Sequence, residues 1–574
     1  MLSETKHCQN CQQLFVIEPD DFAFYEKIKV PPPTFCFDCR VQRRLAFRNE
    51  RGLHKRKCDA PNHGEDMISM FAQDNPQRVY CHRAWWGNDW DAKNYGRDVD
   101  FSKPFLTQLK DLWREVPDVA LLNINPVNSE YCNVTEGNKN CYLVFGGDFN
   151  EHTFYSNYIF NSKECLDTYL VDKSERCYEL IDCLSCTRLS YSRYCEGCYD
   201  SAFLLNCTNC HDCFGCVNLK NKSYCIFNEQ YTKEGYQEKI KEFDISRRSG
   251  VEEMRKKFYE FSLKFPRRFA KMIRATNSTG DNLEETKNCI HCFDMLSGAE
   301  DCRHTYLSYS KTSNCSDVDR TGMNTELGYD SSTIYPGSRV FFSRFTFSSH
   351  DIWYSYNSHN SSYLFGCVGM RNAQYCILNK QYDKDSFEKL KTQIIAQMEQ
   401  DKTYGEFFPM AMSPFPYNES VAQEVFPRPI EHEEKTYIPT IRFQNIPDAI
   451  ADTTEGVLKE IIECEHQGTC IEQCSKAFKI TPAELGLYRN QNIPLPSMCS
   501  NCRHYRRLSQ RNPMKLWHRS CQCTGKAQNQ NDKYQNTAEH SHGDQPCSNE
   551  FETSYAPERP EIIYCEGCYQ AEIS

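Results

Sequence analysis

The sequence predicts a mainly β protein with flanking helices, in which two short-period β-solenoid arrays lie between N-terminal and C-terminal zinc-ribbon modules. Two observations predict this fold. Residues 474–521 align without a gap onto residues 11–58, with 18 of 48 positions identical, so the chain carries two copies of one cysteine-containing module. Between the copies, small or apolar side chains recur every 12 residues. This period is too short for a pair of helices and suits a narrow β-solenoid.

The composition restricts the classes of protein to which the chain can belong. It has 574 residues, a net charge of −11 and 35 cysteines. An acidic chain is not a general polyanion binder, so a nucleic-acid surface would have to be a local patch. The first residues lack the apolar segment of an ordinary signal peptide, and no apolar run reaches the length of a membrane span. We therefore expect a cytoplasmic protein without a membrane partner, whose cysteines bind metal or fill a core. Export by an unrecognised route is the alternative.

The two ribbon modules, residues 1–100 and 461–574, each contain two cysteine pairs separated by about 25 residues. This spacing is typical of a zinc ion held by four thiolates, because soft sulfur ligands suit zinc and the site needs only a tetrahedral arrangement. The predicted ligands are Cys8, Cys11, Cys36 and Cys39 in the N-terminal copy, and Cys470, Cys474, Cys499 and Cys502 in the C-terminal copy.

A second group of candidate ligands follows each ribbon, since residues 71–81 match residues 555–565. In the C-terminal copy we expect a closed site of Cys521, Cys523, Cys565 and Cys568, with His540, His542 and Cys547 as alternative ligands. In the N-terminal copy Ala84 stands where Cys568 would align, so Cys58, His63, Cys81 and His82 predict a mixed site or a decayed one that only packs. The expected cofactor is Zn²⁺, as three ions, or four if this mixed site binds.

The arrays and their connectors occupy the centre of the chain. In the first array, Cys195-x-x-Cys198 and Cys207-x-x-Cys210 resemble zinc knuckles, but within a cysteine-rich repeat we interpret them as stacked neighbours. Residues 524–546, rich in Gln, Asn and His, predict a mobile insertion. The predicted segments are a docking helix and linker (101–130), the first array (131–230), a basic helical connector (231–285), the second array (286–382), and a capping helix with a Pro- and aromatic-rich connector (383–460).

Arginines directly after the second cysteine pair of each ribbon suggest contact with nucleic acid, RNA or DNA, because a guanidinium group presents a planar fork to phosphate. The alternative is that they pair with acidic residues of the protein's own solenoid. The arginines are Arg40, Arg43, Arg44 and Arg48 in the N-terminal copy, and Arg503, Arg506, Arg507 and Arg511 in the C-terminal copy.

Over nearly its whole length the chain resembles a family of uncharacterised zinc-ribbon proteins of candidate-phyla-radiation (Patescibacteria) bacteria. The resemblance rests on the Pro-x-Pro-x-x-Cys-x-x-Cys-Arg-x-x-Arg-Arg block, residues 80–90, the Phe-Gly-Cys-Val array endings, residues 404–409 and residues 552–560. That family usually has Cys at the position of Ala84, so this chain departs from it at the second N-terminal site. The resemblance implies an architecture and no activity.

Three classes of function follow from these features. A non-enzymatic zinc-binding scaffold is the first, because solenoids offer long lateral faces to a protein partner, which the sequence does not identify. A nucleic-acid-binding protein that uses the arginine-rich ribbons is the alternative. An enzyme is the third, but the sequence contains no P-loop, Gly-x-Gly-x-x-Gly, His-Glu-x-x-His or Gly-x-Ser-x-Gly motif and indicates no small-molecule substrate.

Overall fold

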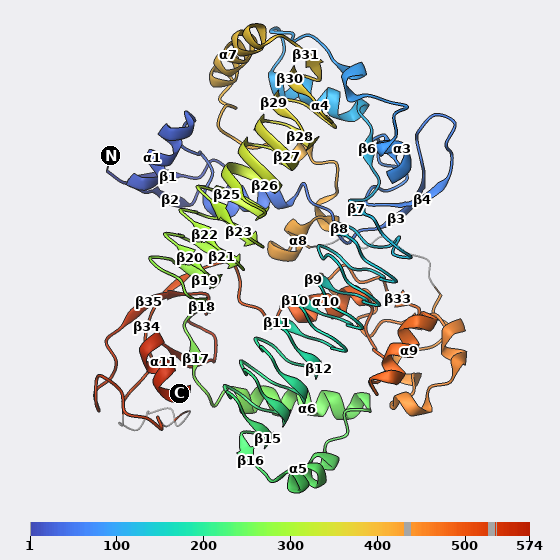
Figure 1. Cartoon of the computed structure of the whole chain (residues 1–574), viewed down its shortest axis with the longest axis vertical. Helices are drawn as coiled ribbons and strands as arrows, with labels where there is room; N and C mark the ends of the chain where they lie inside the picture. The colour runs from blue at the N-terminus through green and yellow to red at the C-terminus, as the bar shows by residue number, and fades with distance from the viewer. Residues whose placement is uncertain (1, 430–437, 526–533, 535, 574) are drawn as a thin grey trace. The chain divides into compact units, whose positions relative to one another are not determined.

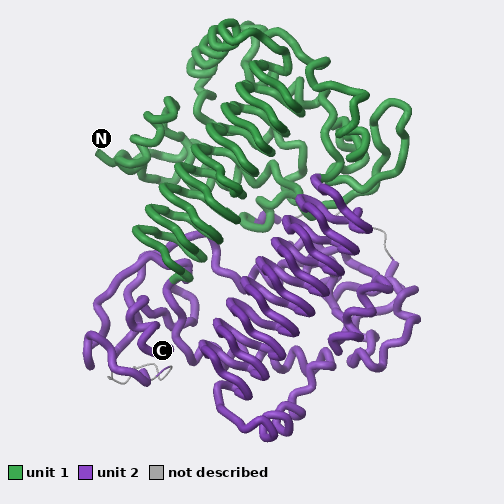
Figure 2. Tube along the Cα trace, viewed as in Figure 1, with its two compact units in different colours: residues 1–121, 270–426 green, residues 122–269, 427–574 purple. Residues whose placement is uncertain are grey.

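The computed structural model describes residues 2–429, 438–525, 534 and 536–573 (Figure 1). The chain forms two compact units, each built from two separate stretches of sequence (Figure 2). Unit 1 contains Met1–Leu121 and Ala270–Phe426, and unit 2 contains Leu122–Phe269 and Pro427–Ser574. The N-terminal ribbon therefore belongs with the second array, and the C-terminal ribbon with the first.

The first array, in unit 2, is a parallel β-solenoid with the predicted 12-residue period. Strands β9 (Asn157–Phe160), β10 (Tyr169–Asp172) and β11 (Ile181–Leu184) pair in parallel, with Tyr169 opposite Asn157 and Ile181. The same register joins β12 (Thr187–Ser190), β13 (Tyr199–Ala202), β14 (His211–Phe214) and β15 (Ser223–Ile226). Coils stacked in this register place equivalent positions of successive repeats one above another. Equivalent positions have similar surroundings, which is why the repeat is visible in the sequence.

Within each coil, the backbone turns at every third residue. Asn161, Glu164, Asp167 and Leu170 all have φ near +50°, in the left-handed region. Twelve residues with a corner at every third position make a four-sided coil with three residues on each side. One residue of each side points inward, and the interior is correspondingly narrow.

Cysteine fills much of this interior. Cys195, Cys198, Cys207 and Cys210 are at most 2% exposed, and their thiols donate to backbone carbonyl groups, as Cys198 Sγ does to the carbonyl of Cys207 at 3.4 Å. The interpretation of these knuckle-like pairs as stacked neighbours is confirmed, because they occupy consecutive inward positions in one buried cluster.

The second array, in unit 1, does not keep the 12-residue period throughout. Strands β26 (Thr325–Phe341), β27 (Arg344–Trp353), β29 (Ser362–Phe365) and β30 (Gln374–Ile377) pair at intervals of 12, as the sequence predicts. Before them, β21 (Cys292–Met295), β23 (Tyr306–Ser308) and β25 (Ser316–Thr321) pair at intervals of 13. The left-handed residues Asp294 and Gly298 are four positions apart instead of three, so one side of that coil has an extra residue.

Each array ends with a short antiparallel strand, which was not predicted, and with a helix, which was. In unit 2, β16 (Glu229–Gln230) pairs with β15 and leads into α5 (Lys233–Lys239). In unit 1, β31 (Lys380–Gln381) pairs with β30 and leads into α7 (Lys384–Gln400). The open edge of the last coil is thus covered, which prevents edge-to-edge association.

The predicted docking helix forms. The basic connector predicted at 231–285 is helical only as far as Ser262, because strands β17 (Arg267–Arg268), β18 (Met272–Ile273) and β19 (Gly280–Glu284) follow. Helix α4 (Phe105–Glu115) buries Phe105, Leu109 and Leu112, and the Phe105 ring lies 5.3 Å from that of Phe365 in the last coil of its unit. Helix α6 (Arg248–Ser262) in unit 2 buries Phe258, which packs against Phe203 of the first array. Phe258 of the basic connector therefore belongs to the core, whereas the neighbouring Tyr259 is exposed.

Candidate metal centres and the arginine helices beside them

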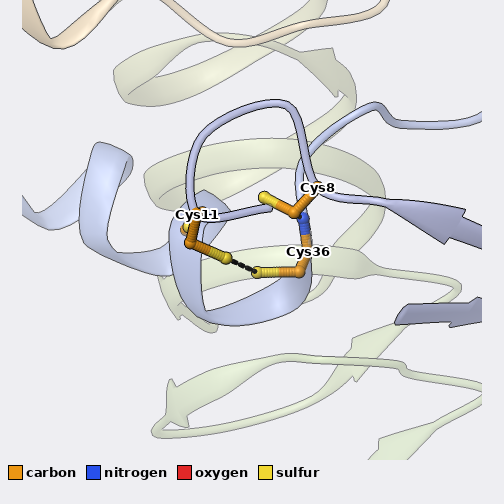
Figure 3. A group of neighbouring side chains, drawn as sticks. Cys8, Cys11 and Cys36 are labelled. Atoms are coloured by element: carbon orange, nitrogen blue, oxygen red, sulfur yellow. Dashed lines mark hydrogen bonds between the residues drawn. The ribbon is translucent and has the colours of Figure 1, made fainter. Parts of the chain in front are cut away.

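The N-terminal ribbon brings its four predicted thiolates together. Three of them, Cys8, Cys11 and Cys36, are labelled in Figure 3. The hairpin of β1 (Glu4–His7) and β2 (Leu14–Ile17) carries Cys8 and Cys11, and Cys36 is the N-cap of α2 (Phe37–Leu45), whose first turn contains Cys39. The Sγ atoms of Cys11 and Cys36 are 3.7 Å apart. Four sulfurs bound tetrahedrally at the usual Zn–S length lie about 3.8 Å apart, so the group fits zinc.

Backbone and amide groups support these thiolates. The Cys36 N–H donates to Cys8 Sγ at 3.2 Å, and Asn10 Nδ2 donates to Cys39 Sγ at 3.2 Å. Such donors stabilise a charged sulfur, and the N-terminus of α2 adds a favourable dipole. The ribbon can therefore hold a divalent cation without rearrangement.

The C-terminal ribbon forms the same group with one different ligand from the one predicted. Cys464, Cys474, Cys499 and Cys502 lie together, with Cys464 Sγ 3.8 Å from Cys502 Sγ. Cys499 is the N-cap of α10 (Ser500–Leu508), and its N–H donates to Cys464 Sγ at 3.2 Å, as Cys36 does to Cys8. Cys464 is thus the counterpart of Cys8, and it takes the place in the four-thiolate group that the sequence assigned to Cys470.

Cys470 instead lies beside this group. Its Sγ is 3.8 Å from Cys502 Sγ, in a set with His466 and Glu472. The first cysteine pair is separated by two residues in the N-terminal copy and by nine in the C-terminal copy, and a gap-free alignment that begins at Cys474 cannot show this insertion. The hairpin identifies Cys464 as a ligand. Cys464 follows β32 (Ile462–Glu463), which pairs with β33 (Ala477–Phe478), just as Cys8 follows β1, which pairs with β2.

The second N-terminal group contains three of its predicted ligands. His63 Nδ1 lies 3.4 Å from Cys58 Sγ and 3.5 Å from Cys81 Sγ, and the Cys81 N–H donates to Cys58 Sγ. Ala84 contributes only its backbone N–H, which donates to Cys81 Sγ at 3.4 Å. The His82 ring lies near that of Trp86. The geometry thus provides a mixed Cys and His set with three convergent ligands.

The second C-terminal group is larger than predicted. Cys521, Cys547, Cys565 and Cys568 form one set, and Cys523, His540, His542 and Cys568 form another. The predicted four cysteines are therefore divided between two sets, and all three alternative ligands take part. Of the insertion predicted at 524–546, residues 526–533 and 535 lie outside the described residues.

The arginines after the N-terminal ribbon are buried against the array of their own unit. Arg40 Nε lies 2.9 Å from Asp317, and Arg44 pairs with Asp319 at 2.8 Å and with Asp330 at 2.7 Å. Arg43 also contacts Asp330, at 2.9 Å, and Arg48 pairs with Glu50. The four arginine side chains are at most 5% exposed.

Unit 2 repeats this arrangement with different residues. Arg503 and Arg507 both pair with the buried Asp167, at 2.9 and 2.8 Å. The remaining pairs join Arg506 to Glu179 at 2.5 Å and Arg511 to Asp182 at 3.0 Å. Asp167 and Glu179 are corner residues one coil apart. Arg503 and Arg507, one helical turn apart on α10, therefore share one carboxylate, whereas Arg506 reaches Glu179 in the next coil.

The ion pairs determine the charge state of the buried carboxyl groups. Burial alone would raise the pKa of Glu179, but Arg255 and Arg506 outweigh it and lower this pKa to about 2. Burial likewise lowers the pKa of the Arg44 guanidinium, yet Asp319 and Asp330 more than compensate and raise it above its usual range. The Glu179 carboxylate and the Arg44 guanidinium are therefore both charged at neutral pH.

The structure thus places seven of the eight arginines as their alternative interpretation predicted, in ion pairs with acidic residues of the solenoid array of the same unit. Arg48 is the exception, because its partner Glu50 belongs to the ribbon module itself. Arg506, at 27% side-chain exposure, is the most open of them. Phosphate binding by these groups would require the ion pairs to break.

No protein-family model matches the chain, and a comparison with curated proteins finds no match. Among the described residues, no helix combines the length and the apolar character that crossing a membrane requires.

Proposed function

We propose that this protein is a non-enzymatic scaffold in which zinc-bound ribbons and β-solenoids together present a rigid surface to a protein partner. The observation that carries the proposal is the burial of the ribbon arginines in ion pairs with solenoid carboxylates. Residues that could have formed a functional surface are used instead to fix each ribbon to an array.

The ligand sets support a structural role for the metal. Each ribbon supplies four thiolates, and zinc in a structural site is four-coordinate. A closed site leaves no position for a catalytic water. The proposed zinc would therefore stabilise the fold of each ribbon.

One side of the first array provides a candidate surface for the partner. We call it the charged side, defined by the exposed residues Lys163, Glu175, Arg176, Arg188, Tyr199 and Asp200. Lys163 is paired in register with Glu175, and Tyr199 stacks on His211 with ring centroids 4.8 Å apart. Groups repeated at one-coil spacing are held by the backbone, so a partner would meet them with little loss of conformational entropy.

The nucleic-acid alternative has no comparable support in the geometry, because its arginines face carboxylates. A titration with single-stranded RNA and duplex DNA at about 50 mM salt is expected to show no binding, since an electrostatic contact would be strongest there.

The scaffold proposal is tested by metal analysis and affinity purification of the full chain. We expect at least three zinc ions per chain. We also expect a captured partner to be lost from the R176E/R188E variant and retained by the control K173E/K220E, which makes the same change of charge on other sides of the array. Fewer than two zinc ions, or a partner that is insensitive to the charged side, would overturn the proposal.

A further inference from the structure

The second C-terminal group contains more ligands than one zinc ion can use. Seven side chains with metal-ligating atoms converge there, from elements on both sides of residues 526–533. They are Cys521, Cys523, His540, His542, Cys547, Cys565 and Cys568. Structural zinc takes four ligands, so a single ion would leave three of these groups uncoordinated.

The first four-ligand set contains only thiolates. Cys521 follows β34 (Trp517–Ser520), Cys565 follows β36 (Ile563–Tyr564), and Cys568 lies in the first turn of α11 (Glu566–Ile573). The Sγ atoms of Cys547 and Cys565 are 3.9 Å apart. The Cys565 N–H donates to Cys521 Sγ at 3.2 Å, the contact that also occurs in both ribbons.

The second set contains two thiolates and two imidazoles. His542 Nε2 lies 3.2 Å from Cys568 Sγ and 3.4 Å from Cys523 Sγ, and His540 Nδ1 lies 3.5 Å from Cys523 Sγ. All four ligand atoms lie within 4.8 Å of one another, and Cys523 and Cys568 are buried. The set shares only Cys568 with the first.

The second ring nitrogen of each histidine has a partner of the kind that metal-bound imidazoles have. His540 Nε2 lies 2.7 Å from the Glu572 carboxylate, whose side chain is fully buried, and His542 Nδ1 lies 2.6 Å from the carbonyl of Gln545. A carboxylate or carbonyl that accepts one N–H leaves the other nitrogen free to bind metal. Those free nitrogens are the two that face Cys523.

We propose that the C-terminal module holds two zinc ions joined by Cys568, whose Sγ bridges the all-thiolate set and the Cys and His set. A thiolate sulfur has several lone pairs and can bind two cations. Five thiolates carry −5 and two Zn²⁺ ions +4, so the pair of ions leaves a charge of only −1 in a buried cluster. This inference rests on the zinc binding proposed above and raises the expected number of ions by one.

The N-terminal copy provides an internal contrast. Cys58 and Cys81 align with Cys521 and Cys565, but Ala84 replaces the bridging cysteine. Cys58, His63 and Cys81 form one convergent set, with His63 Nδ1 between the two sulfurs. The bridged pair is therefore specific to the C-terminal copy.

The test measures zinc per chain in the full-length protein by native mass spectrometry and elemental analysis. We expect H540A/H542A to contain one ion fewer than the wild type. C36S/C39S, the control, is expected to lose one ion from the N-terminal ribbon. An unchanged zinc content in H540A/H542A would overturn the bridged pair while leaving the proposed function intact, whereas a wild-type chain without zinc would overturn both.

A second measurement does not depend on the folding of any variant. Co²⁺ substituted into the wild-type chain should show magnetic coupling between two ions that share a thiolate, seen as an electron paramagnetic resonance intensity below that expected for the bound cobalt. The full intensity of isolated ions in a fully loaded chain would rule out the bridge.

Discussion

At the scale of single residues, we expect the carboxylate of Asp167 to contribute strongly to the stability of unit 2. It is fully buried and pairs with both Arg503 and Arg507. Removing one partner of a buried ion pair leaves an uncompensated charge in a medium of low dielectric constant, which typically costs about 3–5 kcal/mol. We expect D167N to lower the free energy of unfolding by this amount, as measured by urea denaturation.

The matched control for D167N is D200N. Asp200 pairs with Arg188 on the charged side, where both side chains are more than one third exposed. Exposed ion pairs contribute about 0–1 kcal/mol, so D200N is expected to change the free energy of unfolding little. Equal effects of the two substitutions would contradict the structural role assigned to the buried pairs.

Glu179 predicts how stability depends on pH. Its pKa is lowered from 4.5 to about 2 in the folded protein, so the unfolded chain takes up this proton first as pH falls. The stabilisation is complete above about pH 4.5 and is lost as pH falls toward 2; the shift corresponds to roughly 3 kcal/mol.

The measurement compares the free energy of unfolding of the wild type and E179Q between pH 6 and pH 2. Metal loss in acid affects both proteins and cancels in the difference. We expect the wild type to be the more stable at pH 6 and the difference to shrink below pH 4.5. A difference that is constant with pH would show that Glu179 is not held ionised by Arg255 and Arg506.

At the scale of elements, the hairpin before each ribbon helix decides which cysteines bind metal. We expect C464S to lose one zinc ion and C470S to keep the wild-type zinc content, because Cys464 receives the Cys499 N–H at the position of Cys8. Elemental analysis of the two full-length variants checks this. Loss of an ion from C470S alone would restore the ligand set predicted from the sequence.

Elements also show how far the sequence could predict the fold. The 12-residue period was visible because inward positions such as Cys165 and Cys177 repeat small buried side chains. The corners at every third residue were not visible in the sequence. Glu164, Asp167 and Leu170 adopt left-handed backbone conformations, which non-glycine residues disfavour and which the closure of each coil imposes. Cys464 was missed because an insertion separates it from Cys474.

At the scale of the whole molecule, the pairing of ribbons with arrays could not be predicted, because it depends on contacts between residues hundreds of positions apart. Asp317 and Asp167 look in the sequence like other polar residues of a coil. Only the structure shows that Asp317 meets Arg40 and Asp167 meets Arg503. Each end of the chain thus completes a unit whose array is remote in sequence.

The division of the chain into two units predicts which residues unfold locally when one ribbon loses its metal. In C36S/C39S the N-terminal site lacks two ligands, so α2 loses its anchor and the buried Asp317, Asp319 and Asp330 lose their arginine partners. We expect faster amide hydrogen exchange in residues 2–121 and 270–426, and unchanged exchange in residues 122–269.

The reciprocal variant, C499S/C502S, removes two ligands of the C-terminal ribbon and should reverse the pattern. Exchange should then rise in residues 122–269 and in the C-terminal stretch of unit 2, because Asp167 loses Arg503 and Arg507. Hydrogen exchange with mass spectrometry resolves the two units by peptide. If either variant accelerated exchange equally in both, the units would open as one, and the ribbons would not each stabilise a separate array.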